Sequence, residues 1–111
     1  MEYLNSIHLR GVVGRISTVK VQDNECVRIS LATDRAYKDR DGNAVIEITW
    51  HNITGWKHTL KGCDPEDIQN GDILEIEGRV HNVRYAAEDG SDRVFNEVIA
   101  NKIAIINREN K

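Results

Sequence analysis

The chain has 111 residues, of which 40% are hydrophobic and 30% are charged. This length suits one domain with a modest core, and the composition excludes both a disordered polar chain and a membrane-spanning one. The formal net charge is −3, which taken alone argues against a nucleic-acid partner. The sequence predicts a single domain over residues 1–111, and a start with neither a basic leader nor an apolar stretch favours an intracellular location.

Apolar residues alternate with polar ones in five stretches, and this period of two predicts strands. In chain order the stretches cover residues 7–13, 27–32, 46–51, 73–80 and 94–106. Turn residues separate several of them, at Asp41-Gly42-Asn43, Asn70-Gly71-Asp72 and Glu88-Asp89-Gly90-Ser91. Five strands joined by such turns predict an all-β domain.

Only residues 56–67, between the third and fourth strands, have helical character. Gly62 and Pro65 interrupt this segment and limit it to one or two turns. Three strands, a short helical segment and two further strands form the chain order of an OB-fold, a five-stranded Greek-key barrel. Such small barrels need strongly bent strands, and three glycines are suitably placed to bend them: Gly11, Gly14 and Gly78.

The negative charge is confined to the middle of the chain. Residues 41–78 carry two basic and eight acidic side chains, whereas residues 1–40 carry seven against five and residues 79–111 carry six against five. A locally basic face therefore remains compatible with the negative total, and a nucleic-acid partner is not excluded.

Several of the six aromatic residues stand where no core is expected. Tyr37 lies in the charged stretch 34–40, predicted as a loop between the second and third strands, and Tyr85 lies at the tip of the last hairpin. A ring in solvent beside lysine or arginine is typical of single-stranded nucleic-acid binding, where each base that stacks contributes ~1–3 kcal/mol.

Five segments, taken in order, resemble the DNA-binding core of the bacterial single-stranded DNA-binding protein (SSB) family. They are residues 5–14, 29–33, 49–53, 70–79 and 85–98. The resemblance as a whole extends from about Asn5 to Ile106. It implies an OB-fold that binds single-stranded DNA without catalysis, without a cofactor and largely independently of sequence. It also implies a role in DNA replication, recombination and repair in the bacterial cytoplasm, at the nucleoid.

The resemblance further implies which residues contact DNA. Four aromatic residues correspond to positions where the family stacks bases, and three basic residues to positions where it contacts phosphates. The stacking set is Tyr37, Trp50, Trp56 and Tyr85, and the phosphate set is Lys38, Arg40 and Arg84. His51 corresponds to a histidine at the family's subunit interface, which implies a homotetramer, with a dimer as the alternative. The family's linker and acidic tail have no counterpart here, so recruitment of replication and repair proteins does not follow.

Other interpretations fit some of the same residues. Trp50 alternates in phase with Ile46 and Ile48 and could belong to the barrel core, and the three basic residues could be ordinary surface charges. Arg10, Arg28, Lys57 and Arg79 are weaker candidates for phosphate contact.

Other functions also remain open on the sequence. The first alternative is a dimeric primosomal replication accessory protein of the same fold, and the second is an OB-fold scaffold that binds protein or sugar. A nuclease would need converging carboxylates, for which the candidates are Glu75, Glu77, Asp89, Asp92 and Glu97. No metal-ligand spacing occurs among the four histidines and two cysteines, so we expect no metal site and no enzyme.

Overall fold

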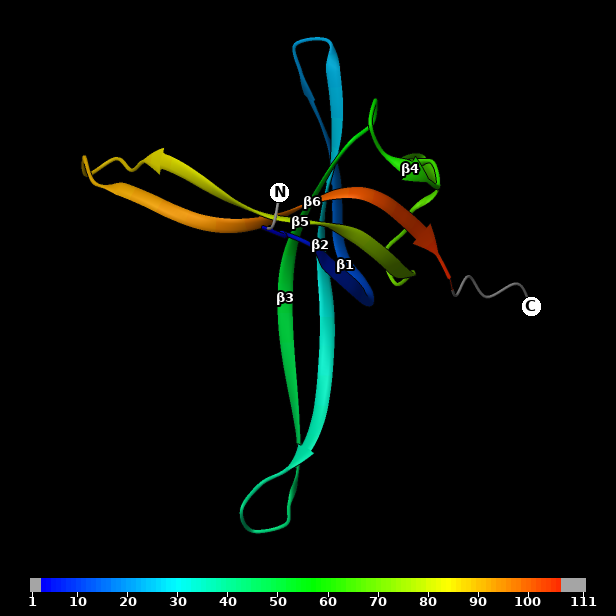
Figure 1. The fold of residues 1–111 in the computed structure, drawn as a ribbon, viewed down its shortest axis with the longest axis vertical. Helices are drawn as coiled ribbons and strands as arrows, with labels where there is room; N and C mark the ends of the chain where they lie inside the picture. The colour runs from blue at the N-terminus through cyan, green and yellow to red at the C-terminus, as the bar shows by residue number, and fades with distance from the viewer. Residues whose placement is uncertain (1–2, 107–111) are drawn as a thin grey trace.

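The computed structural model of the protein describes residues 3–106, and in this part of the chain nearly every residue belongs to a strand or a turn. Figure 1 shows the strands crossing at the centre, with long hairpins extending outward. The elements are β1 (Ile7–Val21), β2 (Asn24–Lys38), β3 (Ala44–Trp56), β4 (Lys61–Gly62), a 3-10 turn η1 (Pro65–Asp67), β5 (Ile73–Ala86) and β6 (Asp92–Ile105).

The five long strands close into a barrel. Antiparallel pairing gives the order β3-β2-β1-β5-β6, and β3 then pairs with β6 in parallel, with Ile53 opposite Val98. The two-residue strand β4 pairs in parallel with Lys102 and Ile103 of β6, further along the edge that β3 occupies. This is the Greek-key barrel of an OB-fold, and the predicted fold class is confirmed. Closure leaves the central strands without free edges.

The core lies inside this barrel and consists of aliphatic side chains from every long strand. Leu31, Ile53, Leu74, Ile76 and Ile103 are at most 1% exposed. The residues between them along each strand face outward, which is the alternation that the sequence displays. The barrel is therefore held by ordinary apolar burial and needs no metal or disulfide.

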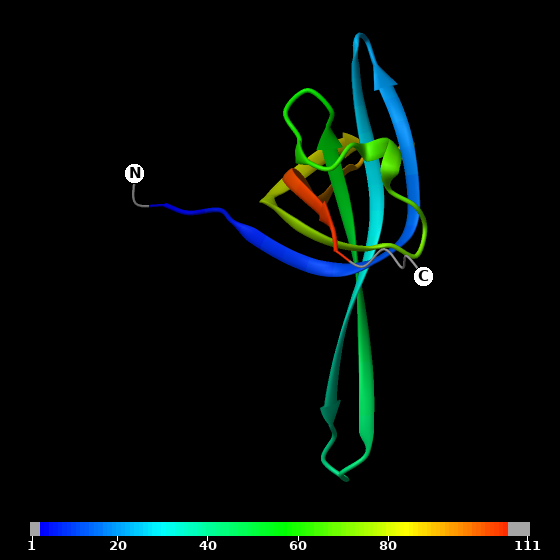
Figure 2. The same cartoon turned by 90° about the vertical axis from the view of Figure 1, so that its right-hand side faces the viewer.

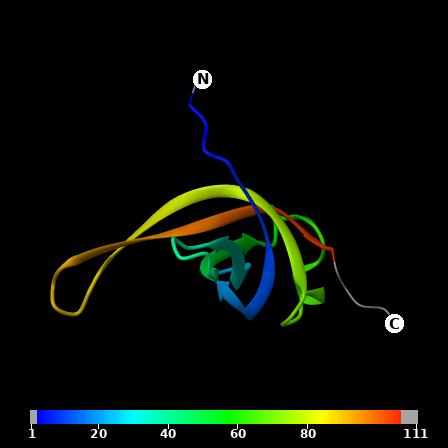
Figure 3. The same cartoon turned by 90° about the horizontal axis from the view of Figure 1, so that it is seen from below.

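Two hairpins continue beyond the barrel as arms. The β2–β3 arm extends downward in Figures 1 and 2, and the β5–β6 arm extends to the side in Figures 1 and 3. Residues 34–38 pair with β3 along the first arm, so the prediction of a loop over residues 34–40 was wrong. This stretch carries charges because both faces of the arm meet water, and apolar alternation is lost where a strand leaves the core.

The remaining differences lie at the ends of elements. Strand β1 runs on to Val21 after a register shift between Val13 and Arg15, a β-bulge that the sequence did not reveal. Trp56 ends β3 instead of starting a helix, and the helical segment is reduced to η1, where Asp64 caps the turn ahead of Pro65. Between residues 3 and 106 no helix has the length and apolar character needed to cross a bilayer.

Candidate nucleic-acid interface

The outer face of the barrel over β1, β2 and β3 carries a patch of polar and basic side chains. Alternation along β3 places Trp50, Asn52, Thr54 and Trp56 on one face. The pairing register sets Asn52 opposite Ser30, and Thr54 opposite Arg28. Six residues of β3 span about 20 Å, so the two tryptophans mark the ends of this patch.

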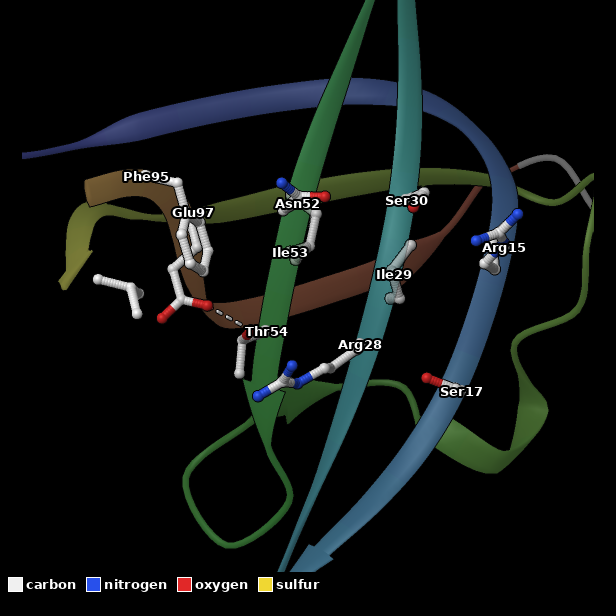
Figure 4. A pocket seen from close by; sticks show the side chains of 11 residues that line it. Arg15, Ser17, Arg28, Ile29, Ser30, Asn52, Ile53, Thr54, Phe95 and Glu97 are labelled. Atoms are coloured by element: carbon white, nitrogen blue, oxygen red, sulfur yellow. Dashed lines mark hydrogen bonds between the residues drawn. The ribbon is translucent and has the colours of Figure 1, made fainter. Parts of the chain in front are cut away.

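A groove lies at the centre of this face, between the barrel and the base of the β5–β6 arm. Its volume is about 310 Å³, and Figure 4 shows side chains from β1, β2, β3 and β6 converging on it. The lining residues are Arg15, Ser17, Arg28, Ile29, Ser30, Asn52, Ile53, Thr54, Val83, Phe95 and Glu97. A floor of hydroxyl, amide and guanidinium groups beside an aromatic ring suits a ligand that has both anionic and flat apolar parts.

Trp50 stands in solvent beside this groove. Its side chain is 60% exposed, and with Gly14, Arg15 and Ser30 it lines a second hollow. The edge of the indole abuts Gly14, because a methyl group there would come within 2.6 Å of two adjacent ring carbons. The alternative that placed Trp50 in the barrel core is therefore wrong.

The β5–β6 arm presents a second aromatic surface. Tyr85 and Phe95 are 48% and 42% exposed, and their rings meet edge to face with centroids 5.9 Å apart. The register pairs Val83 with Phe95 and Tyr85 with Arg93, so these four side chains share one face of the arm. Tyr85 thus has the exposure that the sequence predicted, and Phe95 extends its surface into the groove.

The cations of this arm are split between its two faces. Arg84 pairs with Val94 on the face opposite to Tyr85, whereas Arg93 lies on the same face as Tyr85. Arg93 approaches Asp89 at 3.8 Å, and Asp89 accepts hydrogen bonds from the backbone and hydroxyl of Ser91. Those hydrogen bonds lower the pKa of Asp89 and keep the turn at the tip of the arm closed.

The β2–β3 arm holds Tyr37, Lys38 and Arg40. Tyr37 is 41% exposed and the Arg35 guanidinium lies 5.4 Å from its ring centre. Tyr37 pairs with Val45, so alternation puts it on the face of the arm opposite to Trp50. Lys38 and Arg40 are exposed near the end of the arm. The three residues therefore lie on one arm, apart from the groove, with Tyr37 and Lys38 on opposite faces of it.

Trp56 and His51 are half-buried. Trp56 lies at the end of the polar face. The centroids of its ring and the His58 ring are 6.3 Å apart, and the two ring planes are tilted by 60°. The Nε2 atom of His51 lies 2.9 Å from the Thr33 hydroxyl, a hydrogen bond within the chain.

None of the eleven residues that line the groove was predicted as a site residue, and four of them carry a charge or an aromatic ring: Arg15, Arg28, Phe95 and Glu97. Arg28 appeared only among the weaker candidates, and Glu97 only as a possible metal ligand. Arg15 could not be recognised because the bulge after Val13 changes the face that β1 presents. In residues 3–106 no three His, Cys, Asp or Glu side chains gather closely enough to hold a metal ion, so the five candidate carboxylates do not converge on one point.

The fold defines an OB-fold protein, and its outer surface carries exposed aromatic rings and basic side chains. Residues 4–106 match the single-strand binding protein family, and the chain belongs to that family. This confirms the resemblance on which the site residues were predicted.

Individual relatives agree with this assignment. The "Single-stranded DNA-binding protein" of Neisseria meningitidis serogroup A is 31% identical over 110 residues, which is 97% of this chain and 63% of that protein. The protein of the same description from Xylella fastidiosa is 27% identical over 93% of this chain and 63% of its own length. The chain thus spans less than two thirds of the length of these relatives.

Solved structures share the fold. The structure described as "Plasmodium falciparum SSB complex with ssDNA" superposes with a TM-score of 0.80 at 19% identity, covering 96% of this chain and 98% of that one. A deletion mutant of the single-stranded DNA binding protein from Thermus aquaticus gives a TM-score of 0.75 at 20% identity, covering 94% of this chain and 51% of that one. At these identities the likeness concerns the fold.

Proposed function

We propose that this protein binds single-stranded DNA, without catalysis and largely without sequence preference. The observation that carries the proposal is the groove on the outer face of the barrel, which lies beside the exposed indole of Trp50 and contains two arginines, Arg15 and Arg28. Flat rings in solvent stack on unpaired bases, and guanidinium groups bind phosphates. The names of the relatives support the same function.

In this proposal residues 1–111 act as one binding domain. Bases stack on Tyr37, Trp50, Trp56 and Tyr85, and phosphates meet Lys38, Arg40 and Arg84, to which the groove adds Arg15 and Arg28 on its floor. Exposure supports the roles of Trp50, Tyr37 and Tyr85, each between 41% and 60% exposed, because a buried ring cannot take a base. Duplex DNA binds poorly in this scheme, since paired bases keep their faces stacked within the helix.

The cellular role follows from the same chemistry. A protein that covers unpaired strands acts in replication, recombination and repair, and we place it in the bacterial cytoplasm at the nucleoid. Recruitment of other replication proteins is not part of the proposal. The family's tail would follow residue 106, and residues 107–111 lie outside the described residues.

We further propose a homotetramer with His51 near a subunit interface. Several large apolar side chains of the isolated chain are exposed, among them Leu4 at 89%, Ile46 at 68% and Ile48 at 59%. Exposed apolar surface of this kind favours association between copies. A tetramer would also join several grooves on one DNA strand and so raise the overall affinity.

The proposal is tested with the chain's two tryptophans as reporters, by titrating the protein with oligo(dT) and following fluorescence. We expect quenching by oligo(dT) and little response to a duplex. Trp50→Ala, Trp56→Ala and Tyr85→Ala should each weaken binding by ~1–3 kcal/mol and leave the fold intact. Tyr3→Ala is the matched control, because Tyr3 is 89% exposed and is not among the residues that line the groove. If oligo(dT) changed neither the fluorescence nor the electrophoretic mobility of the wild-type protein, the proposal would be refuted. That result would favour the alternative of an OB-fold scaffold that binds protein or sugar.

A further inference from the structure

One acidic side chain lies inside a groove that otherwise suits a polyanion. Glu97 of β6 lines it together with Arg15, Arg28 and Phe95, and its side chain is 16% exposed. Figure 4 shows the carboxylate beside the Phe95 ring, directed toward Thr54 on β3. A carboxylate opposes phosphates by repulsion, so its place in a DNA-binding groove calls for a different role.

Two neighbours hold this carboxylate in position. The hydroxyl of Thr54, a buried residue, donates a hydrogen bond of 2.8 Å to Oε1, and Nδ1 of His81 lies 3.2 Å from Oε2. His81 faces Glu97 across the β5–β6 pair, so the contact follows from the strand register. Each carboxylate oxygen accepts about two hydrogen bonds. Glu97 is therefore fixed, and each of its oxygens retains capacity to accept another.

The geometry of β6 relates Glu97 to the adjacent aromatic surface. Phe95 and Glu97 are two residues apart on the same face of the strand, about 7 Å along it. A base lying on the exposed Phe95 ring thus has an edge within reach of the carboxylate. Cytosine and adenine carry an amino group at the 4- or 6-position, which donates to a carboxylate. Thymine and uracil carry the O4 carbonyl at that position, which repels a carboxylate, and their one donor on this edge is the neighbouring N3–H.

We propose that Phe95 and Glu97 form a base-reading subsite in the centre of the groove that favours an amino-bearing base over a 4-keto base. This rests on the proposed binding of single-stranded DNA and adds to it a modest preference at one nucleotide position. Phe95 supplies the platform and Glu97 the acceptor. Thr54 and His81 position the acceptor, and the two arginines take the flanking phosphates.

The test compares oligo(dC) with oligo(dU) of equal length at one pH and one salt concentration. These two bases differ only in the 4-substituent and in the proton on the adjacent N3, so stacking and phosphate contacts are closely matched. We expect the wild-type protein to bind oligo(dC) about tenfold more tightly, the discrimination typical of one good base-edge contact. Glu97→Gln should bring the ratio of the two affinities close to one, by weakening oligo(dC) binding and strengthening oligo(dU) binding through a new amide donor.

Two further variants make the outcome decisive. Glu88→Gln removes the same charge near the tip of the arm, outside the groove, and should leave the ratio unchanged. Phe95→Ala keeps the carboxylate but removes the platform, and it should also reduce the ratio even if Glu97→Gln fails to fold. Equal strengthening of both oligonucleotides by Glu97→Gln would show that Glu97 only repels phosphates and would overturn the subsite, as would equal wild-type affinities. Absence of wild-type binding to either oligonucleotide would overturn the proposed function instead.

Discussion

Trp50 and Gly14 form a matched pair on neighbouring parts of the barrel face. Gly14 stands at the register shift of β1, where the missing side chain leaves room for the edge of the indole to abut the strand. A ring whose edge is held against the backbone is already oriented when a base arrives. Less side-chain freedom is then lost on binding, which favours affinity.

Gly14→Ala should weaken single-stranded DNA binding without unfolding the barrel. The new methyl group would lie 2.6 Å from the Cη2 and Cζ3 atoms of Trp50, so the indole must leave its position. The displaced ring is 60% exposed, so its movement costs the fold little. We expect an affinity loss of up to ~1–3 kcal/mol in an oligo(dT) titration, with a nearly unchanged melting temperature.

A double-mutant cycle separates this cause from a general disturbance of β1. In a Trp50→Ala background, Gly14→Ala should have almost no further effect, because the ring it displaces is already gone. Additive losses in the double mutant would contradict the proposed support of Trp50 by Gly14.

At the scale of elements, the sequence predicted the barrel more fully than the arms. Val27, Ile29 and Leu31 alternate because one face of β2 is buried, and this periodicity identifies a strand. In residues 34–38 both faces meet water, so the same strand continues with no apolar pattern to mark it. The ambiguity over Trp50 has the same origin: it shares a phase with Ile46 and Ile48, which resembles a core face but is an exposed one.

The candidate site residues likewise differ in how far the sequence could identify them. The exposed rings Tyr37, Trp50 and Tyr85 could be predicted, because their local surroundings and the family resemblance pointed to them. Phe95 and Glu97 could not, since they become part of a groove only when β6 crosses β3. Long-range strand pairing brings them together, and no local pattern in the sequence records that pairing.

Gly78→Ala should destabilise the barrel itself, unlike Gly14→Ala. Gly78 lies at the register shift between β5 and β6, and a methyl group there would collide with the backbone carbonyl of Ile99. Backbone atoms of a closed barrel cannot move aside as a surface indole can. We expect the free energy of unfolding to fall by about 1–3 kcal/mol in a denaturant titration.

Gly14→Ala is the control for that measurement, because it is the same substitution at another register shift. Equal losses of stability for both variants would contradict the distinction between a backbone and a side-chain neighbour. The comparison therefore tests whether Gly78 is required for barrel closure and Gly14 for the site.

At the scale of the whole molecule, the net charge of −3 conceals how the charges are arranged. The acidic stretch 41–78 supplies only three residues to the groove, and none of them is charged: Asn52, Ile53 and Thr54. The groove arginines come from residues 15 and 28, and the arm cations come from residues 35–40, 84 and 93. The groove itself therefore carries two arginines against one acidic residue, Glu97, although the chain as a whole is negative.

The last prediction concerns assembly. Four copies of a 12.6 kDa chain give a mass of about 50 kDa, which light scattering or sedimentation distinguishes from a dimer of about 25 kDa. We expect the larger mass, and we expect His51→Lys to reduce it, since an added charge at a half-buried interface position opposes association. His58→Lys places the same charge on an exposed residue after β3 and should leave the mass unchanged. A stable wild-type dimer would favour the primosomal accessory protein, and a monomer would contradict both assemblies. A monomer would also have to hold the strand with a single groove, without the gain in affinity that linked sites provide.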